Sequence, residues 1–491
     1  MAHARTFVAI DLGATSGRLM LGRFAGGRLD IEEIHRFANQ PVEYGGELHW
    51  DLPFAWREIR AGLRRLDAMD EVKVDSIGVD AWGVDYALLG ERGNLLENPY
   101  HYRDSRTAGV MERVLDRVPA RTIYEQTGIQ FMPINTLYQL YAAQERTPRL
   151  LGAAKHLVTI PDLIDYWLCG AVACEYTNAS TTQFLAHQTR SWATGLLAEL
   201  GLPTHLLADI VAPGTTLGPL RDGIGSAACA HAVVVAPACH DTASAVASIR
   251  ARGGTAFLSS GTWSLLGTEV SSAVVTGEAR ERNFTNEGGV CGTILLLKNL
   301  TGLWLLEGCV AKWTSEGRTW PWDELLEMAR GAAAARSLID PDHPSFVRPA
   351  EMTAAIDDYC RKTGQPAPRT PPEYVRAVLE SLALKYRQVL EELESVTLTG
   401  FRKIRVVGGG SRNELLNRLT ADITGRTVIA GPVEATSLGN IAMQMLTSGA
   451  VGSLDEARDI IEASHPPSVS EPRQDVNWDA AYALFRDLVR G

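Results

Sequence analysis

The feature that most constrains this fold is a strand–turn–strand pattern that occurs in both halves of the chain. Residues 6–12 predict a strand, a turn rich in glycine and hydroxyl groups follows, and residues 18–24 predict a second strand. In the second half, residues 255–259 and 263–270 predict two strands around the turn Ser-Gly-Thr. We interpret the second pattern as a distant internal repeat of the first.

The repeat and the length together predict two domains. A chain of 491 residues exceeds what one hydrophobic core usually spans. The Gly- and Arg-rich residues 250–254 read as a connection, so we place the domains at 1–248 and 249–491.

Strands alternate with helices in both halves, which indicates an α/β fold. Further strands are expected at residues 28–37, 74–80, 84–89, 232–236 and 403–407. The clearest helix lies between 370 and 395, where Thr-Pro-Pro-Glu has capping-box spacing and eight apolar side chains share one face that should pack along a sheet. Other helices should follow 242, 413 and 437.

Composition excludes several classes of partner. The formal net charge is −11, which argues against nucleic acid or an anionic membrane. The seven cysteines show no Cys-x-x-Cys spacing, so we expect a reducing compartment and no structural zinc. Residues 7–10 are too short an apolar run for a signal peptide, and no later run could cross a bilayer. We expect a cytoplasmic protein.

Three glycine-rich turns could bind a nucleotide. Residues 11–18 place two glycines and two hydroxyls after Asp11, so backbone N–H groups could bind phosphate and Asp11 could hold Mg²⁺. Residues 259–264 repeat this chemistry, and a plain β-hairpin is the alternative for both turns. Residues 406–413 run from a strand through three glycines, where an adenosine could lie against bare backbone, or where the chain simply turns tightly.

The segment Ala-Cys-His-Asp-Thr at 238–242 follows a buried strand and supplies a candidate general base, Asp241. A carboxylate can take the proton of a sugar hydroxyl as that hydroxyl attacks a phosphoryl group. Helix capping is the alternative for Asp241, and a satisfied core histidine is the alternative for His240. Smaller polar clusters, expected mostly on loops, occur at 80–85, 102–106, 286–289 and 298–299.

Other familiar site motifs do not occur. The sequence has no P-loop, no Gly-x-Gly-x-x-Gly fingerprint, no His-Glu-x-x-His helix and no Gly-x-Ser-x-Gly elbow.

With these residues in view, the chain resembles the FGGY carbohydrate kinases, within the larger group of actin-like and hexokinase-like ATPases. Residues 11–18, 259–264 and 406–413 resemble the two phosphate loops and the adenosine motif of that group, in the expected order. Within the family it is most similar to the branch that acts on L-rhamnulose, through residues 79–85, 102–107, 135–140, 240–246, 258–265, 285–289, 297–299, 302–306 and 428–434.

The resemblance implies two actin-like, ribonuclease-H-like domains with an ATP and sugar cleft between them. It implies transfer of the γ-phosphoryl group of ATP to O1 of L-rhamnulose, with Mg²⁺, in L-rhamnose catabolism. It implies the following roles: proton acceptor Asp241; ketose contacts Gly83, His240, Asp241, Thr242 and Asn299; ATP contacts Ala14, Thr15, Ser16, Gly17, Arg18, Thr262, Glu307 and Gly409; and metal site Asp11. Glu307 stands where this resemblance implies glutamine.

Alternatives stay open at this point. The chain could phosphorylate L-fuculose, ribulose, xylulose or glycerol, act as a non-enzymatic ATPase of the actin or chaperone type, or sense a sugar without consuming ATP. We expect small-molecule ligands only, with no nucleic acid and no membrane, and a monomer or homodimer.

Overall fold

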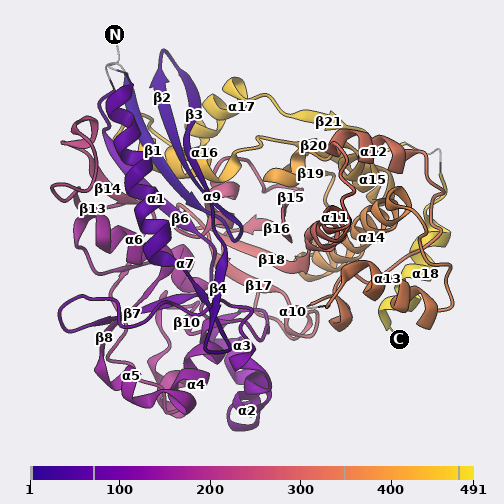
Figure 1. Ribbon diagram of the computed structural model, residues 1–491, viewed down its shortest axis with the longest axis horizontal. Coiled ribbons are helices and arrows are strands. Elements are labelled where there is room, and N and C mark those ends of the chain that lie inside the picture. Colours follow the sequence, from indigo (N-terminus) through magenta and orange to yellow (C-terminus); the bar gives the residue numbers. More distant parts are fainter. Residues whose placement is uncertain (1–3, 70–71, 348, 474–475, 491) are drawn as a thin grey trace. The chain divides into compact units, whose positions relative to one another are not determined.

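The computed structural model describes residues 4–69, 72–347, 349–473 and 476–490 (Figure 1). It divides into two compact units. The first unit comprises Met1–Arg250, Glu269–Leu296 and Ala435–Pro466, and the second comprises Ala251–Thr268, Leu297–Glu434 and Pro467–Gly491. Each unit is made of three separate segments of the chain, whereas the two domains inferred from the sequence are each one continuous segment. The domain limits 1–248 and 249–491 stay a prediction.

The first unit is built on a six-stranded sheet in the order β13-β14-β6-β1-β2-β3. Its strands are β1 (Arg5–Leu12), β2 (Ser16–Ala25), β3 (Arg28–Ala38), β6 (Ser76–Ala81), β13 (Thr215–Pro219) and β14 (Val233–Ala236). The neighbours β1, β6 and β14 run parallel, so their carboxyl ends meet at one edge of the sheet. Three predicted site segments therefore end at the same edge.

Helices cover this sheet, as Figure 1 shows for α16 (Ala435–Thr447) beside β1 and α9 (Asp241–Ala247). The predicted strand 84–89 forms as β7 (Tyr86–Gly90), but it pairs with β8 (Ala154–Thr159) outside the main sheet.

The remaining elements of this unit are α1 (Leu52–Arg65), α2 (Val110–Arg117), α3 (Ala120–Thr127), α4 (Thr136–Arg146), α5 (Pro148–Ala153), α6 (Ile160–Cys169), α7 (Tyr176–Ser180), α8 (Thr194–Glu199), α10 (Gly277–Glu281), α17 (Leu454–Ser464), β4 (Pro41–Tyr44), β5 (Glu47–Trp50), β9 (Cys174–Glu175), β10 (Leu185–Ala186), β11 (Ser191–Trp192), β12 (Ile210–Val211) and β17 (Thr285–Gly288).

The second unit has its own sheet, in which the strand order is β18-β16-β15-β19-β20-β21. The strands are β15 (Thr255–Ser260), β16 (Trp263–Val270), β18 (Ile294–Thr301), β19 (Lys403–Val407), β20 (Thr427–Ala430) and β21 (Ser468–Ser470). The helices are α11 (Trp304–Ser315), α12 (Trp322–Arg330), α13 (Met352–Lys362), α14 (Pro371–Thr397), α15 (Glu414–Thr424) and α18 (Asp479–Arg490). Strands and helices are mixed in both units, as predicted.

The long predicted helix is α14, and its eight apolar side chains are all buried, as expected: Val375, Val378, Leu379, Leu382, Tyr386, Val389, Leu390 and Leu393. Its main partners are helices α15 and α12, rather than a sheet. The predicted capping box is wrong, because the Thr370 side chain makes no cap and the Glu373 carboxylate instead accepts from the N–H of Arg369 at 2.8 Å. The two prolines after Thr370 still start the helix.

Among the described residues, no helix is both long and apolar enough to span a membrane. All seven cysteines are free thiols.

Candidate active site

The hairpin between β1 and β2 is held open as a loop. The N–H of Gly13 donates to the carbonyl of Ser16 at 2.9 Å, and the Asn39 side chain donates to the carbonyl of Gly13 at 2.8 Å. Within the described chain, the N–H groups of Ala14 and Thr15 make no hydrogen bond, and Thr15 is exposed. Backbone donors of this kind are suited to phosphate oxygens.

Gly17 has a packing reason to be glycine. A Cβ atom there would lie 2.2 Å from the ring of Phe37, which is far inside contact distance. The close approach of β2 to Phe37 therefore fixes one glycine of this loop without reference to a ligand.

Asp11, at the end of β1, lies opposite Asp80 in the register of β1 with β6. The Arg18 guanidinium donates to Asp11 Oδ2 at 2.5 Å. Asp80 is fully buried, and its Oδ2 accepts from the Asn440 amide at 2.6 Å, while its Oδ1 has no hydrogen-bond partner in the described chain. Burial, and then the charges of Asp11 and Asp241, raise the pKa of Asp80 well above its usual range.

Asp241 is the first residue of α9, and the N-cap is His240, so the capping interpretation of Asp241 is wrong. The Asp241 side chain is 32% exposed, and its Oδ1 accepts from the Thr242 hydroxyl at 3.2 Å. Burial, and then the negative charge of Asp11, raise the pKa of Asp241 to about 7. A carboxyl with a pKa near neutrality is well matched to accept a proton.

His240 is buried between two carboxyl groups. Its Nδ1 lies 3.4 Å from Glu287 Oε2, and its Nε2 lies 3.5 Å from Asp241 Oδ1. Burial lowers the pKa of His240, and the charge of Glu287 opposes that shift. Glu287 belongs to strand β17 rather than to the loop that the sequence suggested, and Asn299 likewise lies in strand β18.

The backbone of the segment that carries His240 is held by side chains that the sequence analysis did not single out. The N–H of Cys239 donates to Glu175 Oε2 at 2.9 Å, and the N–H of His240 donates to the Thr177 hydroxyl at 3.0 Å. These partners lie 64 and 63 residues away in the chain, so no local motif could identify them. Asn440, which holds Asp80, is 360 residues away from it.

Gly83 lies against Thr181, whose side chain is 2.8 Å from the position of a Cβ atom on Gly83. The next N–H, of Val84, donates to the Thr181 hydroxyl at 3.0 Å. Asp85 is used internally, since its Oδ2 accepts from the indole N–H groups of Trp50 and Trp82. Of the two acidic residues in the 80–85 cluster, only Asp80 therefore lies beside Asp11, and Asp85 holds two tryptophans in place.

In the second unit, two residues assigned to ATP are in contact. The Thr262 hydroxyl donates to Glu307 Oε1 at 3.1 Å, where Glu307 lies in the first turn of α11. The hairpin is fixed against the start of this helix, because the N–H of Trp304 donates to the carbonyl of Thr262 at 3.2 Å. Acidic side chains stabilise the N-terminal turn of a helix, so Glu307 has a structural role independent of nucleotide.

The three glycines after β19 have different reasons to be glycine. Gly408 has a left-handed φ of 80°, and a Cβ on Gly410 would lie 2.0 Å from the Ser260 hydroxyl. Backbone conformation and packing therefore account for two of the three glycines. Gly409 is exposed, and a Cβ atom on it would meet no other atom within 4 Å, so its bare backbone faces open space.

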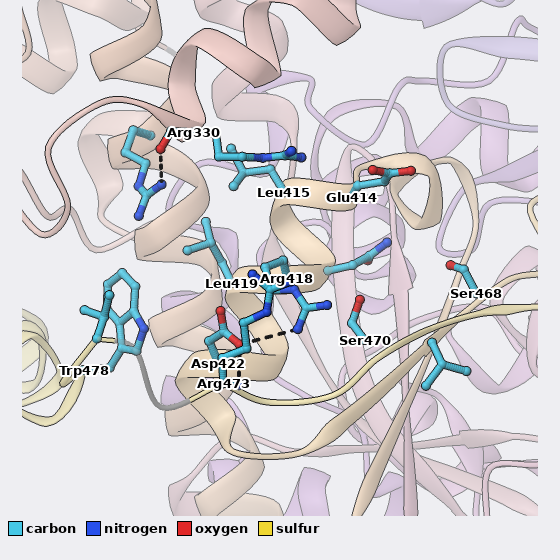
Figure 2. Close-up of a pocket in the computed structure, with 14 residues that line it drawn as sticks. Arg330, Glu414, Leu415, Arg418, Leu419, Asp422, Ser468, Ser470, Arg473 and Trp478 are labelled. Atoms are coloured by element: carbon cyan, nitrogen blue, oxygen red, sulfur yellow. Dashed lines mark hydrogen bonds and ion pairs between the residues drawn. The ribbon is translucent and has the colours of Figure 1, made fainter.

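A cavity of about 430 Å³ in the second unit lies over α15 and is lined by arginines 330, 376, 418 and 473 (Figure 2). None of the site residues predicted from the sequence lines it.

Comparison with known proteins points to the same kind of site. Residues 6–248 match the N-terminal domain of the FGGY family of carbohydrate kinases, and residues 256–448 match the C-terminal domain. The chain belongs to the FGGY family of carbohydrate kinases. The resemblance inferred from the sequence motifs is thereby confirmed.

This FGGY chain is 44% identical over 488 residues to a rhamnulokinase of Bacteroides thetaiotaomicron, with 99% of this chain and 100% of the relative covered. It is 43% identical over 488 residues to a rhamnulokinase of Pectobacterium carotovorum, with 99% and 96% covered. A crystal structure of xylulose kinase from Rhodospirillum rubrum matches with a TM-score of 0.79 at 18% identity, covering 99% of this chain and 98% of that chain. That likeness, together with the family domains, confirms the predicted α/β class with two actin-like domains.

Proposed function

We propose that this protein is an ATP-dependent kinase that transfers the γ-phosphoryl group of ATP to O1 of L-rhamnulose, giving L-rhamnulose 1-phosphate and ADP. The observation that carries the proposal is identity of 44% to a rhamnulokinase along practically the whole of both chains. The carboxylate geometry at the edge of the first sheet supplies the chemistry. Because the proposed reaction consumes ATP, we assign it to the cytoplasm, in L-rhamnose catabolism.

The proposed ATP contacts come from both units. In the first unit they are the hairpin residues Ala14 to Arg18, and the open N–H groups of Ala14 and Thr15 suit phosphate oxygens. In the second unit they are Thr262, Glu307 and Gly409, and the exposed backbone of Gly409 suits the flat face of an adenosine. The charge of Glu307 in place of glutamine should weaken rather than strengthen contact with a polyphosphate.

Asp241 is the proposed proton acceptor, with Gly83, His240, Thr242 and Asn299 contacting the sugar. The O1 hydroxyl donates a hydrogen bond to Asp241, which points an O1 lone pair at the γ-phosphorus. As the O1–P bond forms and the bond from phosphorus to the ADP oxygen breaks, the proton passes from O1 to Asp241. Positioning and charge stabilisation account for most of the rate enhancement.

The residues present fit a hard divalent cation. Asp11 and Asp80 are adjacent carboxylates, and one oxygen of Asp80 has no hydrogen-bond partner in the described chain. Oxygen donors of this kind are what Mg²⁺ prefers. We assign Asp11 to the metal site, where bound Mg²⁺ would neutralise charge on the β- and γ-phosphates. Arg18, which now pairs with Asp11, would then be available to a phosphate oxygen.

ADP release in a coupled assay tests the proposal, with L-rhamnulose, L-fuculose, D-ribulose, D-xylulose and glycerol compared at equal concentration. We expect kcat/KM for L-rhamnulose to exceed that for each other acceptor by at least about tenfold, since a lost hydroxyl contact leaves a polar group unpaired. A preference for another sugar would redirect the assignment within the family. ATP turnover that ignores every sugar would exclude a sugar kinase.

The proposed base predicts an acid limb in the pH dependence of activity. Asp241 must be ionised to accept a proton, and its pKa is raised to about 7. Below that pH the protonated form dominates, so kcat/KM for the sugar should fall about tenfold per unit as pH decreases. Initial rates between pH 5 and 9 measure this, with return to pH 8 as a control for unfolding. An inflection near pH 4 would contradict the shift.

A further inference from the structure

A cluster of metal-ligating side chains lies beneath the proposed active site, within the first unit. Asp162 and Asp165 lie one turn apart on α6, and Cys239 directly precedes His240. One ligand atom from each of the three lies within 4.8 Å of the other two. All three residues are buried.

Asp165 is the unusual member. It is 1% exposed, and neither of its carboxylate oxygens has a hydrogen-bond partner in the described chain. The charged groups that act on it are Asp162 and Glu175, both acidic. A buried carboxylate with no donor and no cation is costly, because burial removes its hydration and nothing replaces it. The Asp165 carboxylate lies close to ligand atoms of Asp162 and Cys239, and this arrangement indicates a place for a cation.

Asp162 differs because it is already oriented. Its Oδ1 accepts from the N–H of Glu175 at 2.9 Å, and its Oδ2 accepts from the Thr159 hydroxyl. Hydrogen bonds of this kind typically fix a metal-ligating carboxylate in place. The cluster thus combines one pre-oriented carboxylate, one carboxylate without partners, and one thiol.

We propose that Asp162, Asp165 and Cys239 bind a divalent cation of the zinc type. A thiolate favours Zn²⁺ over Mg²⁺, so this site is distinct in chemistry from the metal site assigned to Asp11. Donors around a tetrahedral zinc lie about 3.5 Å apart, and the three ligand atoms lie within 4.8 Å of one another, so the side chains need to close by no more than about 1.3 Å. Binding releases the thiol proton, and two carboxylates with one thiolate leave a net charge of −1 around the ion.

The cation would tie helix α6 to the segment that carries the proposed base. Cys239 is two residues before Asp241, and its N–H is already held by Glu175. A bond from the Cys239 thiolate to an ion on α6 would hold the segment 239–241 through a side chain as well as through the backbone. Spacing rules could not find this site, because its cysteine lies far along the chain from both carboxylates and has no neighbouring cysteine. The inference goes beyond the proposed kinase activity, and its test does not depend on that activity.

The test is the zinc content of the full chain, produced with Zn²⁺ in the medium, purified without a metal-affinity tag and measured by elemental mass spectrometry. We expect close to one zinc per chain in the wild type. Asp165→Asn and Cys239→Ser should retain at least about tenfold less zinc. Cys291→Ser, which alters an exposed cysteine, should retain as much as the wild type.

A spectroscopic experiment on the wild type guards against variants that fail to fold. The protein is stripped with a chelator in mild denaturant and refolded with Co²⁺ alone. A thiolate-to-cobalt charge-transfer band that the Cys291→Ser protein keeps would support the site.

Zinc-free wild-type protein that unfolds at the same temperature with and without added Zn²⁺ would overturn the proposal. In that case the buried carboxyls are protonated, and Asp165→Asn, which removes a buried acid, would unfold at the same temperature as the wild type or higher.

Discussion

Replacing Asp241 by Asn is expected to lower kcat by about 10²- to 10⁴-fold, the range that a positioned general base contributes. The amide has the size of the carboxylate but cannot take the O1 proton. Asp241 is partly exposed at the start of α9, so the substitution leaves no unpaired buried charge. Binding of ATP should change little, because the proposed nucleotide contacts lie in other segments.

Two measurements separate loss of the base from loss of the fold. Steady-state rates of ADP release give kcat, and calorimetric titration with ADP gives nucleotide affinity in the same preparation. Asp116→Asn, an exposed acid on α2 of the same unit, is the matched control and should keep wild-type values of both. An Asp241→Asn enzyme that turns over at the wild-type rate would refute the assignment of the base.

The parts of this fold that depend on local sequence were predictable. Both strand–turn–strand patterns form as β1–β2 and β15–β16, because a short, mostly buried apolar run that ends at a turn is a signal within a few residues of sequence. Asp11 lies near the end of the buried strand β1, and Asp241 starts the helix that follows the buried strand β14. Both positions follow from the local order of strand, turn and helix.

The support around those residues was not predictable. Asn440, Glu175 and Thr177 make ordinary amide, carboxylate and hydroxyl contacts, and only the tertiary fold brings them to Asp80 and to the His240 segment. The polar residues 286–289 suggested a loop, yet residues 285–288 form strand β17, because burial against α7 outweighs their low strand propensity. Capping at Thr370 failed for a local reason, since the N–H of the neighbouring Arg369 donates to the Glu373 carboxylate instead.

The contact between α9 and α16 should be the most sensitive point of the first unit. The backbones of these helices approach closely at Gly439, where a Cβ atom would lie 1.7 Å from the carbonyl oxygen of Ser244 and 3.2 Å from the N–H nitrogen of Ser248. Both obstacles are backbone atoms, so no rotamer change can relieve the overlap. The helices must separate instead, which disturbs packing along their whole contact.

Gly439→Ala is therefore expected to reduce the free energy of unfolding by about 3 kcal/mol, at the upper end for overpacking. For a unit of this size that corresponds to a midpoint roughly 5 °C lower in thermal unfolding followed by circular dichroism. Gly195→Ala is the control, because this glycine also lies in a helix, α8, and has nothing within 4 Å of a Cβ. It should raise stability by about 0.4–1 kcal/mol by restricting the unfolded chain.

The same substitution should act on catalysis below the unfolding temperature. Helix α9 starts at Asp241, and α16 carries Ser437 and Asn440, which contact Asp11 and Asp80. Separating the two helices shifts all three carboxylates relative to one another, and a displacement of about 1 Å can cost a hundredfold in rate. Equal midpoints for Gly439→Ala and Gly195→Ala would show that the helices do not pack as closely as described. A lower midpoint with unchanged kcat would show that Asp241 is positioned by the Glu175 and Thr177 contacts alone.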